Sequence, residues 1–258
     1  MSRRQRQQSN EAAQQSPNKN FSRGRNRTAQ QTNNVVDINN YRRPVKNKVL
    51  LLPKNIAQEN YIEQLEDDNI DICFATGYAG TGKTYLSVLY GIRCLKEGIV
   101  DRVIISRPNV GIDSSDIGFL PGNIMQKMAP WTRPIFDVFE EYYSVKEITA
   151  MVEENIIEVV ALQHVRGRTF KNAIVIIDEA QNTTPNAMLS ILTRIGEGSK
   201  LLITGDLAQT DIGQSNGLSD FIDRFTGSKR ISISQFGKDA IERHPVITEI
   251  LKMYGKDY

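Results

Sequence analysis

Short apolar runs alternate with longer amphipathic stretches from about Asn47 to the end of the chain. This alternation is typical of βαβ units, whose strands pair in parallel. It predicts strands over residues 72–75, 103–106, 156–160, 173–177, 201–204 and 231–234. It predicts helices over residues 57–65, 83–96, 123–139, 186–194, 218–225 and 239–253. We therefore expect one α/β core, a parallel sheet with flanking helices.

One segment interrupts the alternation. Residues 111–150 follow a strand without returning directly to the next, so we expect an inserted helical segment above the sheet. Within it, Ile124, Met128 and Ile135 recur at helical spacing. Because proline breaks the hydrogen-bond ladder of a helix, we expect Pro130 and Pro134 to kink or divide this one.

The first 46 residues differ in composition from the rest. They hold ten Lys/Arg and two acidic residues (10 − 2 = +8), while residues 47–258 hold 22 basic and 28 acidic residues (22 − 28 = −6). They also hold fifteen Asn/Gln, and Phe21 and Tyr41 are their only aromatics. Such a segment buries too little apolar surface to offset its ordering entropy, so we expect a disordered basic arm over residues 1–46 and one domain over residues 47–258.

The arm contains one string with chemical meaning. Arg23, Arg25 and Arg27, separated by Gly24 and Asn26, resemble the arginine-rich segments that bind RNA or DNA phosphates. A solubilising tail is the alternative interpretation.

Several classes of protein are excluded by composition. The longest apolar run, residues 173–177, is far shorter than the roughly 20 residues of a membrane span, and the first 30 residues hold no hydrophobic stretch of a secretory signal. Cys73 and Cys94 fall in predicted core elements, and His164 and His244 are the only histidines, which argues against a zinc site. We expect a soluble cytoplasmic protein.

The first functional motif follows the first predicted strand and opens a helix. The pattern G-x-x-x-x-G-K-[ST] is formed by Gly77, Tyr78, Ala79, Gly80, Thr81, Gly82, Lys83 and Thr84. Such a loop wraps phosphates with its backbone N–H groups, and the helix dipole favours the same anion. Lys83 would reach the β- and γ-phosphates and Thr84 would ligate Mg²⁺. The pattern predicts a P-loop NTPase.

The second motif is a pair of acids, Asp178 and Glu179, directly after the apolar run 173–177. At the carboxyl edge of a parallel sheet, Asp178 would hold Mg²⁺ through water, and Glu179 would orient or deprotonate the attacking water. The pair of acids favours hydrolysis of the nucleotide over transfer of its phosphate to another molecule. A small-molecule kinase would need an acceptor pocket, for which the sequence shows no sign.

With these motifs the chain resembles the PhoH family of P-loop ATPases, whose nucleotide domain is similar to one lobe of superfamily-one helicases. The resemblance implies a RecA-like fold. The resemblance runs from about Pro53 to Tyr254. It rests on the two motifs above and on these strings: Pro53-x-Asn55-x-x-Gln58-x-x-Tyr61, Ser106-Arg107-Pro108, Gly118-Phe119-Leu120-Pro121-Gly122, Arg166-Gly167-Arg168-Thr169, Asp178-Glu179-Ala180-Gln181-Asn182, Leu192-Thr193-Arg194-Ile195-Gly196, Thr204-Gly205-Asp206-x-x-Gln209 and Arg243-His244-Pro245.

The resemblance implies roles for further residues. Gln58 would contact the adenine edge through its amide, or else be an exposed helix glutamine. Gln209 would sense the γ-phosphate, or else cap its loop. Arg107, Arg194 and Arg243 are the candidates for an arginine finger, with Arg243 first, although any of them could be a salt-bridge partner.

The chain also departs from the family. Tyr78 stands where the family commonly has a small residue or proline, and residues 211–218 differ from its usual Leu-Pro-containing segment. Some members carry a nuclease domain before the ATPase. Residues 1–46 are too short for one, so we do not expect ribonuclease activity.

These features lead to one functional hypothesis with an alternative. We expect a Mg²⁺-dependent ATPase coupled to single-stranded RNA or DNA in a helicase-like way. Since one lobe leaves the nucleotide facing solvent, we expect a homo-oligomer whose neighbour supplies an arginine, and the resemblance points to a hexameric ring. The alternative is an ATP-binding, nucleic-acid-associated assembly protein without unwinding activity.

Overall fold

The computed structural model describes residues 46, 48–108, 124–165, 167–212, 216–242 and 245–254. All of them lie in one of the two units into which the chain divides, Arg43–Tyr258. Residues 1–45 of the expected arm lie outside the described residues, as do Arg166, Arg243 and His244.

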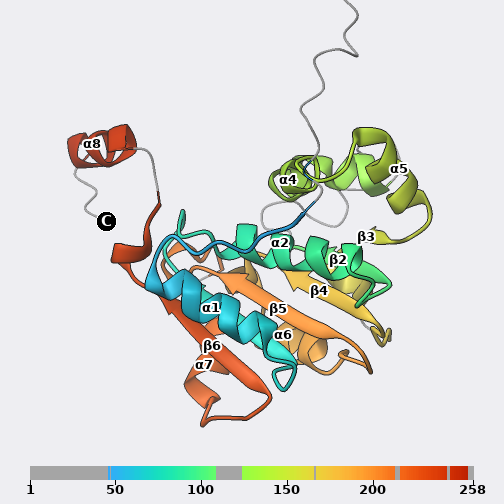
Figure 1. Ribbon diagram of the computed structural model, residues 1–258. Coiled ribbons are helices and arrows are strands. Elements are labelled where there is room, and N and C mark those ends of the chain that lie inside the picture. Colours follow the sequence, from blue (N-terminus) through green and yellow to red (C-terminus); the bar gives the residue numbers. More distant parts are fainter. Residues whose placement is uncertain are drawn as a thin grey trace, which may run out of the picture. The chain divides into compact units, whose positions relative to one another are not determined.

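Six strands of the described chain form one parallel sheet (Figure 1). Its order is β3-β2-β4-β5-β1-β6. The strands are β1 (Ile72–Gly77), β2 (Arg102–Ser106), β3 (Ile157–Val159), β4 (Ala173–Ile177), β5 (Lys200–Gly205) and β6 (Ile231–Phe236). Each corresponds to a predicted strand, so the expected parallel sheet is confirmed. Because β5 lies between β1 and β4, the loops that leave these three strands meet at one edge.

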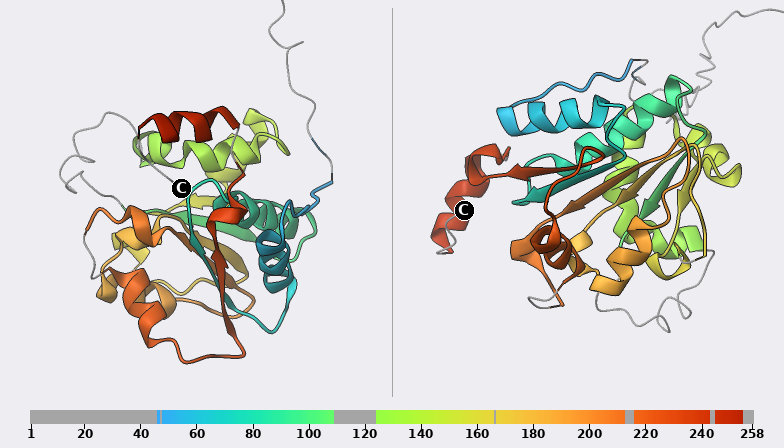
Figure 2. Two further views of the ribbon diagram at one scale, coloured as in Figure 1. Left: turned by 90° about the vertical axis from the view of Figure 1, so that its left-hand side faces the viewer. Right: turned by 90° about the horizontal axis from the view of Figure 1, so that it is seen from below.

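Helices cover both faces of the sheet (Figure 2). One face carries α1 (Ile56–Glu66), α2 (Lys83–Lys96), α4 (Ile124–Phe139) and α5 (Val145–Glu153). The other carries α6 (Pro185–Leu192) and α7 (Gly217–Arg224). The helix α8 (Pro245–Met253) follows β6, and short 3-10 turns lie at η2 (Leu162–Val165), η3 (Ala180–Asn182), η4 (Leu207–Gln209) and η5 (Lys238–Ala240).

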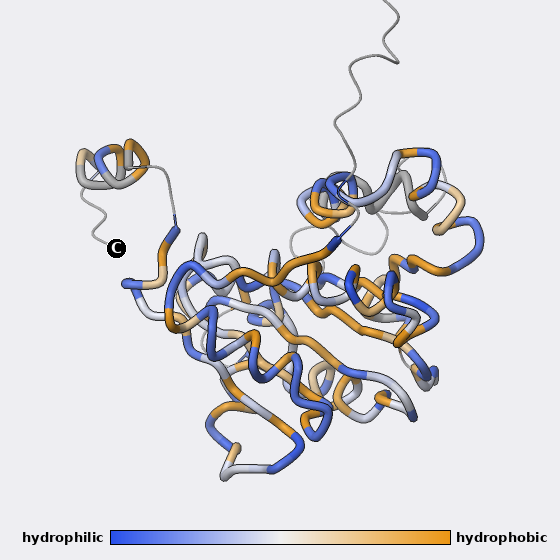
Figure 3. The backbone as a smooth tube through the Cα atoms, in the orientation of Figure 1, coloured by the Kyte–Doolittle hydropathy of each residue, from blue (hydrophilic) through white to orange (hydrophobic). Residues whose placement is uncertain are grey.

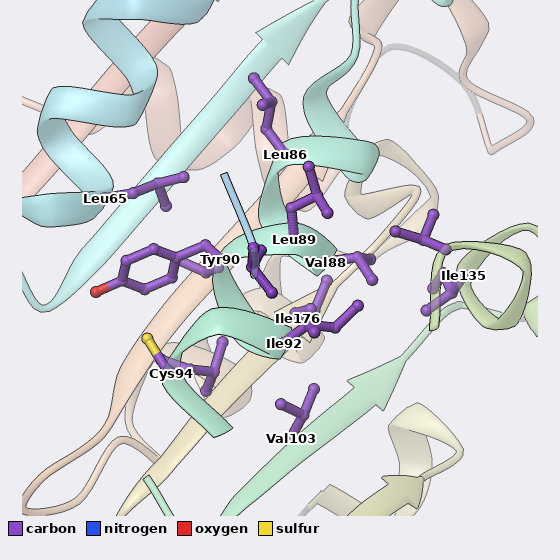
Figure 4. Packing of buried hydrophobic residues seen from close by; sticks show 14 of the residues in the cluster. Leu65, Leu86, Val88, Leu89, Tyr90, Ile92, Cys94, Val103, Ile135 and Ile176 are labelled. Carbon is purple, nitrogen blue, oxygen red and sulfur yellow. The ribbon is translucent and has the colours of Figure 1, made fainter. Parts of the chain in front are cut away.

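The two-residue period of the strands divides the core between these faces. In β1, Cys73 and Ala75 pack with α1 and α2, whereas Ile72 and Phe74 pack with α6 and α7. Since both of its faces are covered, β4 is apolar and buried along its whole length, whereas the edge strand β6 contains polar residues. Figure 3 shows the hydropathy along the backbone. Figure 4 shows α2 packed over the first face through Leu86, Leu89 and their neighbours.

The inserted segment differs from expectation in two ways. A kink or a division was expected at Pro130 and Pro134; helix α4 is one element from Ile124 to Phe139, so the division is wrong and the kink stays a prediction. Each proline costs a helix roughly 3 kcal/mol. Burial of Ile135, Val138 and Phe139, at about 1.5–3 kcal/mol each, offsets that cost.

Helix α5 was not expected as a separate element. It begins with a capping box in which Ser144 accepts from the Glu147 backbone N–H while the Glu147 carboxylate accepts from the Ser144 N–H. The sequence carries this signal as Ser-x-x-Glu before an apolar run.

The last helix begins later than predicted. A helix was expected from Asp239, but α8 starts at Pro245, and residues 238–240 form only the short turn η5. Proline favours the first position of a helix and disfavours helical backbone in the residue before it. The boundary therefore lies at the proline.

Candidate active site

The loop between β1 and α2 is built around glycines that no other residue could replace without strain. Gly77 has φ +129°, and an added Cβ would lie 2.1 Å from the carbonyl oxygen of Phe236 on the adjacent strand β6. Gly82 caps α2 in the left-handed conformation, with φ +85°. These positions let the main chain turn sharply from the strand into the helix.

Lys83 lies buried at the first position of α2. Its Nζ donates to the carbonyl oxygens of Gly77 (2.7 Å) and Tyr78 (2.6 Å) and lies 3.2 Å from Thr81 Oγ1. The loop thus folds around its own ammonium group. A phosphate oxygen could replace these neutral acceptors and gain a stronger, charge-assisted hydrogen bond.

Thr84 and Asp178 bring the two motifs together. The Thr84 hydroxyl donates to Asp178 Oδ1 over 2.8 Å, and Thr204 on β5 donates to the same oxygen over 2.7 Å. Asp178 Oδ2 accepts no hydrogen bond from any residue that the structure describes. One carboxylate oxygen is therefore fixed by two hydroxyls while the other remains available for a cation.

These donors fit Mg²⁺. The Thr84 hydroxyl donates a hydrogen bond to Asp178, so the lone pairs of its oxygen can bind a cation. Hard oxygen ligands of this kind suit Mg²⁺. No group of three or more His, Cys, Asp or Glu side chains within the described ranges could hold a metal ion by itself. Magnesium at such a site takes its remaining ligands from phosphates and water.

Glu179 has an unusual backbone. It follows β4 with φ 56° and ψ 40°, the left-handed region, which costs a non-glycine residue roughly 1–2 kcal/mol. Its Oε1 accepts from Arg107 Nη2 (2.9 Å) at the end of β2, and its Oε2 accepts from Gln181 Nε2 (2.6 Å). Strained backbone held by such contacts is typical of functional positions.

The loop after β5 completes the site through Asp206. Its carboxylate accepts from the Ala79 backbone N–H (3.0 Å), the Ala208 N–H (2.9 Å) and Gln209 Nε2 (2.8 Å). Its own N–H donates to Gln181 Oε1 (3.0 Å). Gln181 therefore contacts both Glu179 and the loop that carries Gln209.

A cavity of about 210 Å³ unites these groups. Among the predicted site residues it is lined by Ala79, Gly80, Gly82, Lys83, Thr84, Asp178, Glu179 and Gln209. Tyr85, Gly205 and Asp206 also line it and were not predicted. The arrangement has a cationic lysine, backbone donors and carboxylates around one space, which suits a metal-bound phosphate.

Comparison with known proteins identifies the family of this chain. The profile of the family described as "PhoH-like protein" matches residues 50–255. The chain belongs to the PhoH family. The resemblance found in the sequence is thereby confirmed.

Several relatives share this part of the chain. It is 38% identical over 205 residues to the "PhoH-like protein" of Bacillus subtilis (strain 168), covering 79% of this chain and 63% of the relative. It is 38% identical over 209 residues to the "Protein PhoH" of Escherichia coli (strain K12), covering 80% and 58%. The match thus spans about three fifths of the length of these relatives.

One solved structure shows a distant likeness. It is described as the crystal structure of Pif1 helicase from Candida albicans, with a TM-score of 0.38 and 15% sequence identity. The likeness covers 79% of this chain and 44% of the other.

Two predicted site residues of this PhoH-family chain, Gln58 and Tyr78, have side chains that contact other parts of the chain. The buried amide of Gln58 donates to the Thr81 carbonyl oxygen (3.0 Å) and accepts from the Lys54 N–H (2.9 Å), so its polar groups are engaged within the chain. The ring of Tyr78 lies 5.7 Å from Lys238 Nζ. Contact of Gln58 with adenine stays a prediction.

The three candidate arginines have different positions. Arg107 is an ion-pair partner of Glu179 beside the cavity. Arg194 donates to Thr193 and lies next to Phe170, where the chain enters β4, at the opposite edge of the sheet. Arg243, the first choice, lies outside the described residues.

No helix within the described residues is long and apolar enough to cross a bilayer.

Proposed function

We propose that this chain binds ATP with Mg²⁺ and hydrolyses it to ADP and phosphate. The observation that carries the proposal is that Lys83 and Thr84 line one cavity with Asp178 and Glu179. A loop that only binds phosphate has no need of a second acid beyond the metal-linked aspartate. Glu179 supplies that acid on a strained turn at the same cavity.

Some of the cavity residues would bind the nucleotide and the metal, and Glu179 would act in the chemical step. Lys83 would exchange its carbonyl partners for β- and γ-phosphate oxygens, and the loop N–H groups would hold the same phosphates. Thr84 and Asp178 would hold Mg²⁺, which neutralises charge on the phosphates when bound. Glu179 would accept a hydrogen bond from the attacking water and orient it.

Glu179 needs to give up a partner for this role. Both of its oxygens accept hydrogen bonds, one from Arg107 and one from Gln181. If neither were released, the chain would bind ATP without turnover, and it would fit the alternative of a nucleic-acid-associated assembly protein that uses ATP only as a structural ligand. Arg107 could turn from the glutamate toward the developing charge on the phosphate, because it pairs with Glu179, which lines the cavity.

We also propose that copies of the chain assemble, with a hexameric ring as the expected form. The described residues make one lobe, and its cavity opens at one edge of a single sheet. Large apolar side chains are exposed on the α1 segment at Leu52 and Ile56 and on the C-terminal helix at Ile250 and Met253. A second copy would cover such surface and close the cavity.

Coupling to single-stranded RNA or DNA is the third element of the proposal. It is supported by the net charge of +8 on residues 1–46 and by the string Arg23, Arg25 and Arg27. Each basic residue that contacts a phosphate releases counterions, so binding through the arm would weaken steeply with salt.

Phosphate release from ATP, with and without single-stranded RNA or DNA, tests these proposals. We expect hydrolysis by the full chain, and none by Lys83→Ala. Replacing Arg23, Arg25 and Arg27 by glutamine should lower only the stimulation by nucleic acid. The matched control replaces three exposed lysines of the folded unit, Lys48, Lys171 and Lys229, by glutamine and should leave stimulation unchanged. Equal loss in both variants would contradict a role of the arm.

A further inference from the structure

Asp206 occupies an unexpected place for an acid. It is buried at the carboxyl end of β5, and its Oδ2 takes the Ala79 N–H of the phosphate loop at 3.0 Å. The same oxygen takes the side-chain amide of Gln209 at 2.8 Å. A carboxylate oxygen is thus bound to a donor of the loop and to the predicted γ-phosphate sensor at once.

A phosphate oxygen would seek these same two donors. Backbone N–H groups of this loop type cradle phosphates, and Ala79, Asp206 and Gln209 all line the cavity that contains Lys83. A negative oxygen from the ligand and the Asp206 carboxylate cannot both occupy one donor, and they repel each other at that range. Any ligand whose phosphate reaches Ala79 therefore has to displace Asp206.

We propose that Asp206 is a specificity-determining residue that sets how strongly the site prefers a nucleoside triphosphate over a diphosphate. The inference rests on the proposed ATP-binding function. A diphosphate can be held by Lys83 and the helix end while Asp206 keeps Ala79 and Gln209. The third phosphate of a triphosphate would displace the Asp206 carboxylate and accept the hydrogen bond from Gln209 in its place. Moving this charged side chain costs free energy, which lowers the affinity for the triphosphate.

The Asp206 backbone is linked to Glu179 by hydrogen bonds through Gln181. The Asp206 N–H donates to Gln181 Oε1, and Gln181 Nε2 donates to Glu179 Oε2. Gln181 is 1% exposed, so its amide has no water with which to replace a lost partner. A shift of the Asp206 backbone that accompanies displacement of its carboxylate would therefore change the hydrogen bonding of Glu179.

The variants Asp206→Asn and Asp206→Ser test the role of the Asp206 carboxylate. Asp206 caps the short turn η4 by accepting from the Ala208 N–H, and asparagine and serine are good caps, so both keep this bond. Both remove the negative charge that a third phosphate has to displace. Asp211→Asn is the matched control, since it removes one exposed acid five residues later in the same segment.

The test measures affinities of the full chain for Mg²⁺-ADP and for the Mg²⁺ complex of the non-hydrolysable β,γ-imido analogue of ATP. We expect both Asp206 variants to bind the triphosphate analogue at least about ten-fold more tightly, with ADP affinity changed less than about two-fold. Asp211→Asn should change neither.

Equal changes for both nucleotides, or weaker binding of the triphosphate, would overturn the role of Asp206 while leaving ATP binding intact. If one Asp206 variant fails to fold, the other carries the test. Wild-type protein that binds neither nucleotide would instead overturn the proposed function, so the two failures are distinguishable.

Discussion

Thr84 donates a hydrogen bond to Asp178 over 2.8 Å, although 94 positions separate them in the chain. Thr84 lies in the first turn of α2, and Asp178 directly follows β4. Strand β5 lies between β1 and β4, and its Thr204 donates to the same oxygen. The contact therefore depends on the order of three parallel strands, and it joins the phosphate loop to the acid pair.

Loss of the Thr84 hydroxyl should weaken the effect of Mg²⁺ on the affinity for ATP. In Thr84→Ala, we expect Mg²⁺ to raise the affinity for ATP less than in the wild type, because the hydroxyl ligand is lost and Asp178 keeps only Thr204 of its two hydroxyl donors. Thr84→Ser keeps the hydroxyl and should bind like the wild type. Calorimetric titration in both conditions measures this. A magnesium dependence equal to that of the wild type in Thr84→Ala would contradict the assignment of Thr84 as a metal ligand.

Glu179→Gln should separate binding from turnover. The amide keeps the size of the side chain but cannot accept a proton, so we expect the rate of hydrolysis to fall by about 10²–10⁴-fold, the usual contribution of a general base. The affinity for ATP should stay within about two-fold of wild type, since Lys83 and Thr84 are untouched. Single-turnover phosphate release gives the rate. Hydrolysis at the wild-type rate would exclude Glu179 from the chemistry.

The parallel sheet and the loop motif could be predicted from the sequence for physical reasons. Strands covered on both faces, such as β4, are wholly apolar and stand out from amphipathic helices. Glycine at position 77 is required where a Cβ would meet the Phe236 carbonyl. Since carboxyl ends of parallel strands share one edge, Asp178 was also expected near the loop.

The remaining features of the fold and the site depend on contacts between segments that are distant in the sequence. The pairing of Arg107 with Glu179 requires β2 and β4 to be neighbours, which strand order alone determines. Glutamine in a helix is usually exposed, yet tertiary contacts bury the Gln58 amide against the Thr81 carbonyl oxygen. Continuity of α4 through its prolines likewise follows from burial against the core and not from local propensity.

Asn55 should stabilise the fold through the start of α1. Its side-chain oxygen accepts from the Gln58 N–H, and its Nδ2 donates to the Ala240 carbonyl oxygen. We expect Asn55→Ala to lower the free energy of unfolding by about 1–2 kcal/mol, because a helix cap and a tertiary bond are lost. Asn55→Ser keeps the cap and should lose less. Urea unfolding compares the three proteins, and equal stability of all three would contradict the assignment.

Tyr61 should make the fold sensitive to alkaline pH. Burial raises the pKa of Tyr61 well above its usual range, although its hydrogen bond to Ser87 lowers it. Above about pH 10 a tyrosine in the unfolded chain loses its proton while the folded one keeps it, so the free energy of unfolding falls as pH rises. Below that pH both states are protonated and stability is unaffected.

Substitution tests the size of this effect. Tyr61→Phe should reduce the slope of stability against pH by about 1.4 kcal/mol per pH unit above about pH 10, the value for one proton. Tyr254→Phe removes an exposed hydroxyl and serves as the control. Urea unfolding at a series of alkaline pH values gives the slope. An unchanged slope in Tyr61→Phe would show that Tyr61 does not titrate differently in the two states.

Calorimetric titration of the full-length chain with ATP and Mg²⁺ tests most directly whether the cavity around Lys83 is a nucleotide site. We predict saturable binding by wild-type protein and at least about ten-fold weaker binding by Lys83→Ala, since an ammonium bonded to phosphate is lost. Absence of binding by folded wild-type protein, or equal binding by both proteins, would contradict the account.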